Sequence, residues 1–150
     1  MYKPNTNFRQ SPQEIDFKFF KEGYWDNKGN IREELLTIEA EEVAKSFENS
    51  GLTKTQLRAF FNEIKGLSNR IDGKKENWDK VYPMVLMIKS KVEYRSSKDS
   101  KMASLKHFLK RSVAYIQKEN RANKGYQAFE TFVIFFETVV GYSYGLKIKE

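Results

Sequence analysis

The chain has 150 residues and a formal net charge of +7, with no cysteine and a single histidine, His107. This length fits one domain with a sizeable core, and the composition excludes disulfide frameworks, thiolate metal sites and sites that need two imidazoles. We expect a cytoplasmic protein without a membrane partner, because no window holds the roughly eighteen apolar residues of a span and residues 1–10 lack an export signal.

The charge is unevenly distributed along the chain. Residues 1–52 hold 7 Lys or Arg against 10 Asp or Glu, a balance of −3, whereas residues 53–150 hold 20 against 10, a balance of +10. A basic body behind an acidic lead segment fits a protein that meets a polyanion with one surface and another protein with a different one.

Residues 1–30 are the least determined region, because proline and glycine interrupt them repeatedly. We expect a partly ordered N-terminal arm there, with a short turn of helix at residues 13–21. The second half of the arm should pack on the body, since it holds more aromatic residues than a free tail would. These aromatic residues are Phe19, Phe20, Tyr24 and Trp25.

Residues 31–49 have the apolar spacing of a helix. Glu33 and Glu34 fall in its first turn, where the helix dipole favours acidic side chains. Gly51 follows the last apolar residue and predicts the end of the helix.

The best-specified helix of the chain begins at Thr53. Thr53 and Gln56 stand three residues apart, which predicts a capping box in which each side chain accepts the other residue's backbone N–H. Apolar residues recur along one side: Leu57, Phe60, Phe61, Ile64 and Leu67. Another arc, about 80° wide at 100° per residue, holds hydrogen-bond donors and no carboxylate: Lys54, Arg58, Asn62, Lys65 and Asn69. Such a stripe could meet phosphates, although solvated helix faces commonly carry Lys and Arg that bind no partner.

The segment after this helix is polar. Residues 68–77 predict a loop with a turn at Asp72 and Gly73. A long helix follows, with its apolar stripe at Trp78, Val81, Val85, Ile88 and Val92. Because proline fits the first turn of a helix better than its interior, we expect residues 74–82 to form a separate short turn before Pro83.

Two further basic faces follow. Lys91 and Arg95 lie four residues apart on one helix face, with Arg95 close to the apolar stripe. After a polar break at residues 96–100, another amphipathic helix follows. Its apolar stripe holds Met102, Leu105, Leu109, Val113 and Ile116. Its opposite arc is basic and holds Lys106, His107, Lys110, Lys118 and Arg121. His107 on this arc is most simply a surface residue, or one more donor to phosphate.

The last helix is predicted at residues 126–145, after a break at residues 122–125. It is apolar on nearly every side, which places it in the middle of a helical bundle. A strand competes at residues 132–136, since aromatic and β-branched residues favour sheets. The apolar run contains no turn signal, however, and it is too long for one strand.

Motifs of catalysis are missing from the chain. It contains no Gly-rich phosphate loop, no H-E-x-x-H, no nucleophile elbow and no aromatic RNP motif. Glu137 stands alone among apolar residues, which favours the surface edge of a helix over a catalytic role. Asp72 and Asp79 could bind Mg²⁺ weakly, but a solvated turn is the simpler interpretation. We therefore expect no catalytic residue, no metal site and no cofactor.

Four segments, in this order along the chain, resemble the small subunit of type III-A CRISPR-Cas effector complexes, the Csm family. They are residues 24–47, 52–65, 89–95 and 129–144, and the resemblance covers about residues 24–147. It implies a subunit whose copies lie along the guide RNA and target RNA, stack head to tail and contact the backbone-type subunits and the large subunit. It also implies that other subunits perform the chemistry.

We expect an all-α, single-domain bundle of about five helices, with an arm at residues 1–23 and the helical small-subunit domain at residues 24–150. We expect its function to be non-catalytic binding of the RNA backbone without sequence preference, since in the family that it resembles guide pairing reads the sequence. The resemblance implies RNA contact at the positions that match the family's motifs, which are Arg58, Lys65, Lys91 and Arg95. The helix-face argument adds Lys54, Lys106, Lys110, Arg111, Lys118 and Arg121. The alternative is a helical adaptor that binds only protein, through an aromatic surface.

Overall fold

The computed structural model describes residues 17–150, which contain five long helices and no strand beyond an isolated bridge between Trp25 and Ile31. The long helices are α2 (Ile38–Ser50), α3 (Lys54–Ile71), α4 (Trp78–Ser96), α5 (Ala103–Arg121) and α6 (Gly125–Gly145). A short helix and three 3₁₀ turns complete this part of the chain: α1 (Phe19–Glu22), η2 (Glu33–Leu36), η3 (Lys75–Asn77) and η4 (Ser100–Met102). The predicted all-α fold is confirmed, while the division into arm and domain stays a prediction.

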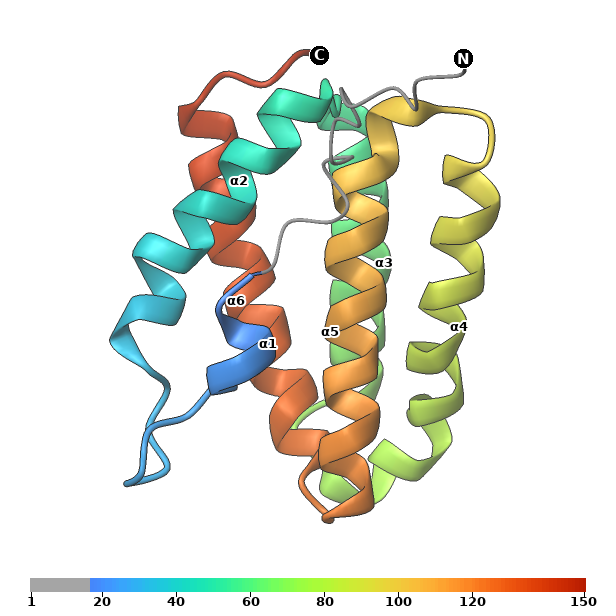
Figure 1. Ribbon diagram of the computed structural model, residues 1–150. Coiled ribbons are helices and arrows are strands. Elements are labelled where there is room, and N and C mark those ends of the chain that lie inside the picture. Colours follow the sequence, from blue (N-terminus) through green and yellow to red (C-terminus); the bar gives the residue numbers. More distant parts are fainter. Residues whose placement is uncertain (1–16) are drawn as a thin grey trace, which may run out of the picture.

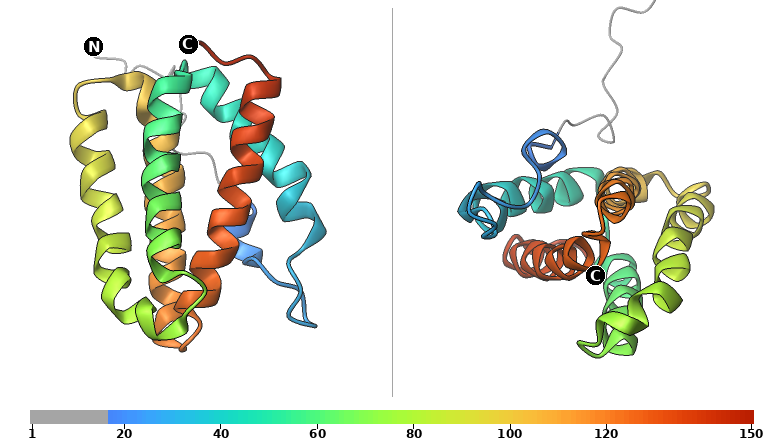
Figure 2. Two further views of the ribbon diagram at one scale, coloured as in Figure 1. Left: turned by 180° about the vertical axis from the view of Figure 1, so that it is seen from behind. Right: turned by 90° about the horizontal axis from the view of Figure 1, so that it is seen from below.

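The long helices run alternately up and down and form one bundle (Figures 1 and 2). Helix α6 packs on α2, α3 and α5, as its apolar composition predicts, and α4 packs on α3 and α5 at the outer edge of the bundle (Figure 1). One face of α6 stays exposed and includes Glu130, Ile134, Glu137 and Gly141. None of the helices in residues 17–150 is long and apolar enough to cross a membrane.

Local signals define the boundary between α2 and α3. Gly51 ends α2 in the left-handed conformation, with φ 85°, and the N–H of Leu52 donates to the carbonyl of Phe47 at 3.1 Å. The capping box at α3 is confirmed: the Gln56 N–H donates to Thr53 Oγ1 at 3.2 Å, and the Thr53 N–H donates to Gln56 Oε1 at 3.0 Å. The predicted end of α2 and start of α3 are therefore correct, and the turn at Asp72 and Gly73 also forms, with φ values of 52° and 66°. The predicted end of α3 is wrong, because the helix continues to Ile71, four residues into the loop expected at residues 68–77.

Two further boundaries differ from the prediction. The predicted helix at residues 31–49 is split, because Thr37, with φ −119° and ψ −95°, separates η2 from α2. The predicted separate turn at residues 74–82 is wrong: η3 ends at Asn77, and Pro83 lies inside α4. Trp78 is buried and its indole N–H donates to Asn120 Oδ1 at 2.9 Å, which holds the first turn of α4 against α5.

The core is rich in aromatic rings centred on Phe108 of α5. Its ring lies between 5.6 and 6.3 Å from six other rings: Phe17, Phe19, Phe47, Phe132, Phe135 and Phe136. Phe17, Phe19 and Tyr24 are buried, which confirms that the second half of the arm packs on the body. His107, expected as a surface residue or one more donor to phosphate, is half-buried, with its ring 5.7 Å from that of Phe17. The rest of the arm and of the predicted turn at residues 13–21 lies outside the described residues.

A buried ion pair fastens the segment that leads into α2. Arg32 and Glu39 form two parallel hydrogen bonds, at 2.7 and 2.8 Å, and their side chains are only 9% and 2% exposed. Arg32 Nε also donates to the carbonyl of Gly23 at 2.9 Å. The hydrogen bond to Glu39 raises the pKa of the Arg32 guanidinium above its usual value. The segment before α2 is thus held by a charged pair as well as by aromatic packing.

Candidate nucleic-acid interface

The basic stripe of α3 lies along its contact with α6. Arg58 Nε donates a hydrogen bond to the Tyr144 hydroxyl at 2.9 Å, and the guanidinium stands 5.4 Å from the centre of that ring. Each lysine of the stripe meets a carboxylate: Lys54 Nζ lies 2.9 Å from Glu150 Oε1, and Lys65 Nζ lies 3.9 Å from Glu137 Oε1. The stripe has no carboxylate of its own, as expected, but α6 and the residues after it supply two. We call Lys54, Arg58 and Lys65 the α3–α6 seam.

A second group of cations lies where α4 meets the other flank of α3. Lys91 Nζ contacts Glu63 Oε1, and Arg95 Nη1 lies 3.6 Å from Glu63 Oε2. The Arg95 guanidinium also stands 4.6 Å from the centre of the buried Phe60 ring, so this side chain packs on the core as well as carrying charge. Lys91 and Arg95 form the α3–α4 seam.

The third group lies where α5 meets α4. Lys110 Nζ contacts Glu93 Oε1, and Lys106 Nζ lies 3.6 Å from Glu93 Oε2. The hydrogen bond from Lys110, together with the charge of Lys106, holds the pKa of the Glu93 carboxyl below its usual value. Lys106 and Lys110 form the α4–α5 seam.

The remaining predicted residues lie farther along α5. Arg111 and Lys118 border a shallow hollow of about 160 Å³ beside the half-buried Tyr115. Lys118 and Arg121 occupy the last turn of α5, where cations complement the negative end of the helix dipole. Arg111, Lys118 and Arg121 form the α5 end group.

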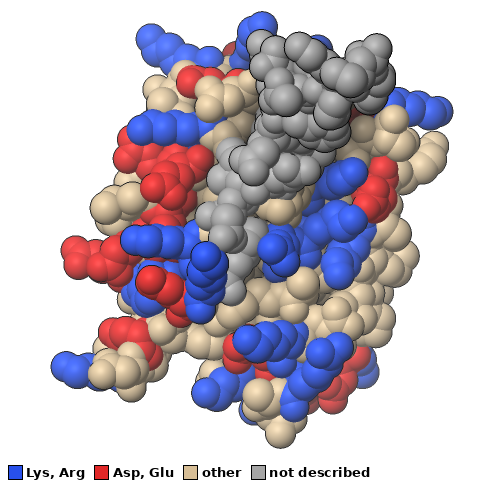
Figure 3. All heavy atoms as spheres, viewed as in Figure 1, with Lys and Arg blue, Asp and Glu red and all other residues tan. Residues whose placement is uncertain are grey.

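These groups do not share one flat face. Lys91 and Glu93 are two residues apart on α4, hence roughly 200° apart around its axis at 100° per residue. The α3–α4 and α4–α5 seams therefore lie on opposite flanks of α4. Lys and Arg gather over α5 and the adjoining flank of α4, whereas most Asp and Glu of this view lie on the α2 side, interspersed with some Lys and Arg (Figure 3). The arrangement offers several narrow cationic tracks on one bundle, with an acidic region beside them.

A comparison with protein families identifies the chain. The description Csm2 Type III-A matches residues 31–145, which include α2 to α6 and every basic residue assigned above. The chain belongs to the Csm2 Type III-A family. Csm2 is the small subunit of Csm complexes, so the chain is a subunit of a type III-A CRISPR effector that assembles with other Csm subunits and crRNA. Csm2 subunits are generally structural and non-catalytic. No curated protein and no solved structure matches the chain.

Sequence reasoning missed the side chains that hold the Lys and Arg residues of the seams in place, chiefly Glu63, Glu93 and Tyr144. Glu63 borders the apolar stripe of α3 on the side away from the basic stripe, and such a border position predicts contact with a neighbouring helix. Which cation it meets depends on how α4 is rotated against α3, and no local pattern reports that rotation. Glu137 was expected at a surface edge, and its side chain is 60% exposed.

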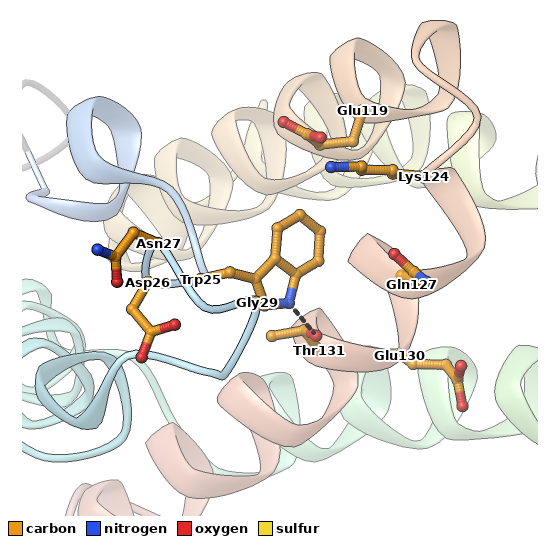
Figure 4. A pocket seen from close by; sticks show the side chains of 9 residues that line it. All are labelled: Trp25, Asp26, Asn27, Gly29, Glu119, Lys124, Gln127, Glu130 and Thr131. Carbon is orange, nitrogen blue, oxygen red and sulfur yellow. Dashed lines mark hydrogen bonds between the residues drawn. The ribbon is translucent and has the colours of Figure 1, made fainter.

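A hollow of about 710 Å³ lies apart from these seams, where the segment after α1 meets α5 and α6 (Figure 4). It is lined by Trp25, Asp26, Asn27, Gly29, Glu119, Lys124, Gln127, Glu130 and Thr131. The Trp25 indole N–H donates to Thr131 Oγ1 at 3.3 Å at its floor. Three carboxylates against one lysine make it unsuited to phosphate. Within residues 17–150, no cluster of three or more His, Cys, Asp or Glu side chains could hold a metal ion.

Proposed function

We propose that this Csm2-family subunit binds RNA through the sugar-phosphate backbone, without catalysis and without sequence preference. The observation that supports the proposal most is the pair of cationic seams on the two flanks of α4. The side chains of Lys91, Arg95, Lys106 and Lys110 are 40%, 42%, 33% and 40% exposed, so their charged ends are accessible. Backbone contacts position a protein on nucleic acid and carry no sequence information.

The ion pairs at the seams do not block this function. An exposed ion pair contributes only about 0–1 kcal/mol, because water and salt screen it. An RNA phosphate can therefore take over a lysine or arginine from Glu63 or Glu93 at small cost. In the free subunit, the carboxylates keep the cations at the surface and in defined positions. Lys54, Arg58 and Lys65 of the α3–α6 seam, and the α5 end group, extend the proposed contact to other parts of the bundle.

The partners proposed for this surface are the guide RNA and the target RNA. A subunit that must accept any target has to ignore base identity, since pairing with the guide reads the sequence. Further copies of the subunit, the backbone-type subunits and the large subunit would meet the remaining surfaces. The acidic region over α2 and the exposed face of α6 are the areas available to them.

A second candidate function is a protein-binding adaptor with no role in nucleic-acid binding. It is favoured by an apolar groove of about 490 Å³ between α2 and α6, lined by Glu41, Thr138, Gly141, Tyr142, Gly145 and Leu146. The aromatic surface expected for such an adaptor is largely absent from the described residues, because most of their aromatic rings are buried in the core. RNA binding is the better supported function, because a protein-binding groove does not account for the cationic seams.

The test is direct binding of the purified full chain to several unrelated single-stranded RNAs at two salt concentrations. We expect weak binding that is similar for all sequences and falls steeply as salt rises, because released counterions drive it. A strong preference for one sequence, or an affinity that ignores salt, would contradict the proposal. An adaptor would fail to bind any of the RNAs even at low salt.

A further inference from the structure

The outer side of α4 carries an uncharged ridge between the two cationic seams. Its residues fall within about 80° of arc at 100° per residue. All are exposed: Pro83, Met87, Ser90, Tyr94 and Ser97. Tyr94 stands out because it is 73% exposed, more than any other large hydrophobic residue at the surface of the described chain. Both the position of the ring and its exposure leave it accessible to a ligand.

Two lysines lie near Tyr94 in the sequence. Lys91 lies three residues before it on the same side of α4. Lys98 lies four residues after it, in the turn that follows the end of α4 at Ser96. Glu93 points to the opposite flank, where Lys106 and Lys110 hold it.

The guanidinium of Arg95, the next residue, is directed toward α3 and not over the Tyr94 ring. It lies over Phe60 and reaches Glu63 of α3. The cation that is nearest in sequence is therefore committed to the seam, and it does not cover the exposed ring. Many proteins bind single-stranded nucleic acid by stacking bases on exposed aromatic rings and holding the backbone with nearby cations.

We propose that Tyr94 is a base-stacking residue, on whose ring an unpaired RNA base lies while Lys91 and Lys98 hold the adjoining phosphates. This inference rests on the proposed RNA-binding function and deepens it. Stacking tolerates every base, because each has a π-face, so the role agrees with binding that ignores sequence. A protein partner fits the ridge less well, since Met87 and Tyr94 are its only large apolar side chains and a stable protein interface buries about 1,000 Å² or more.

The test compares Tyr94→Leu and Tyr94→Phe in the full chain. The ligands are a 12-nucleotide oligouridylate and an abasic ribose-phosphate oligomer of the same length. We expect Tyr94→Leu to bind oligouridylate at least about five-fold more weakly than the wild type, from the loss of one stacked base. Binding of the abasic oligomer and the salt slope should not change, because no cation is removed. Tyr94→Phe keeps the ring and should bind like the wild type.

Ile38→Ala is the matched control, since Ile38 is a 60% exposed apolar residue on α2, away from the seams. It should leave both affinities unchanged, and thermal melts check that each variant is folded. Equal binding of oligouridylate by Tyr94→Leu and the wild type, with a normal salt slope, would overturn the stacking role and leave the proposed function standing. The stacking role would also be overturned if Tyr94→Leu lost the same factor of affinity for oligouridylate and for the abasic oligomer. If the wild type shows no salt-dependent RNA binding, both proposals fail together.

Discussion

At the scale of single residues, two glutamates restrain four of the cations assigned to RNA. Glu63 contacts Lys91 and lies near Arg95. Glu93 contacts Lys110 and lies near Lys106. In the free subunit these carboxylates keep flexible side chains in one place. In the proposed complex with RNA they would compete with the phosphates for the cations and repel the phosphates. Removal of a glutamate should therefore strengthen RNA binding, although it weakens a contact within the protein.

We predict that Glu63→Gln and Glu93→Gln each raise the affinity for single-stranded RNA at low salt, by up to about five-fold, the equivalent of one exposed ion pair. Glu48→Gln removes the same charge from the exposed surface of α2 and is the matched control. Fluorescence anisotropy with a labelled RNA measures all three. If Glu48→Gln raises the affinity as much as the other two variants, the effect is one of net charge and the seams are not the contact.

The Glu93 carboxyl also gives the stability a defined pH dependence. Its pKa is lowered in the folded chain by Lys110 and Lys106, so its contribution to the free energy of unfolding is complete above the usual glutamate pKa. That contribution is lost as the pH falls through the lowered value. The urea midpoints of the wild type and Glu93→Gln should therefore differ at neutral pH and converge in acid. A difference that persists unchanged in acid would mean that the pair does not stabilise the fold.

The Arg32–Glu39 pair should matter far more for stability than the seams do. Both side chains are nearly inaccessible to water, and loss of one partner leaves the other charge buried and unpaired. We predict that Glu39→Ala lowers the free energy of unfolding by about 3–5 kcal/mol, as for other broken buried pairs. Urea unfolding followed by circular dichroism measures the loss. Glu41→Ala, whose partner Lys45 is exposed, is the control and should cost less than about 1 kcal/mol.

At the scale of elements, α3 is the helix whose start depends most on its own sequence. Thr53→Ala removes the hydroxyl that accepts the Gln56 N–H and should lower the free energy of unfolding by about 1 kcal/mol. Thr55→Ala, an exposed position in the first turn of the same helix, is the control and should change stability by much less. Equal losses in the two variants would show that the capping box does not stabilise α3.

The elements also show which signals in a sequence are reliable. Gly51, the capping box and the turn at Asp72 act through bonds between residues that are close in the chain, so their prediction from sequence was correct. The continuous helix through Pro83 involves a distant contact, since the Trp78–Asn120 hydrogen bond holds the first turn of α4 against α5. The break at Thr37 lies between Arg32 and Glu39, whose side chains pair across it although they are only seven residues apart. Propensity alone predicts neither boundary, because side-chain contacts override it.

At the scale of the whole molecule, the surface position of the candidate cations was predictable from the sequence, and their layout was not. Helical spacing places the cations on the surface of α3, α4 and α5, because the opposite sides carry the apolar stripes. The layout requires knowledge of how the helices are rotated against each other, which local patterns do not contain. The expected basic face is therefore divided among seams that follow the helix contacts. Csm2 membership, by contrast, could be inferred from the order of short motifs.

The central claim is that defined seams, and not net charge alone, hold RNA. The most direct measurement is the slope of log affinity against log salt for single-stranded RNA with the wild type, Arg58→Ala, Arg95→Ala and Lys149→Ala. Arg58 and Arg95 lie on different seams, and each substitution should reduce the slope by about 0.7 for one lost phosphate contact. Lys149→Ala, an exposed cation outside the seams, should change it much less. Thermal melts must accompany Arg95→Ala because its side chain packs on Phe60. Equal losses in all three folded variants would contradict the account, since binding would then be diffuse attraction to a basic protein.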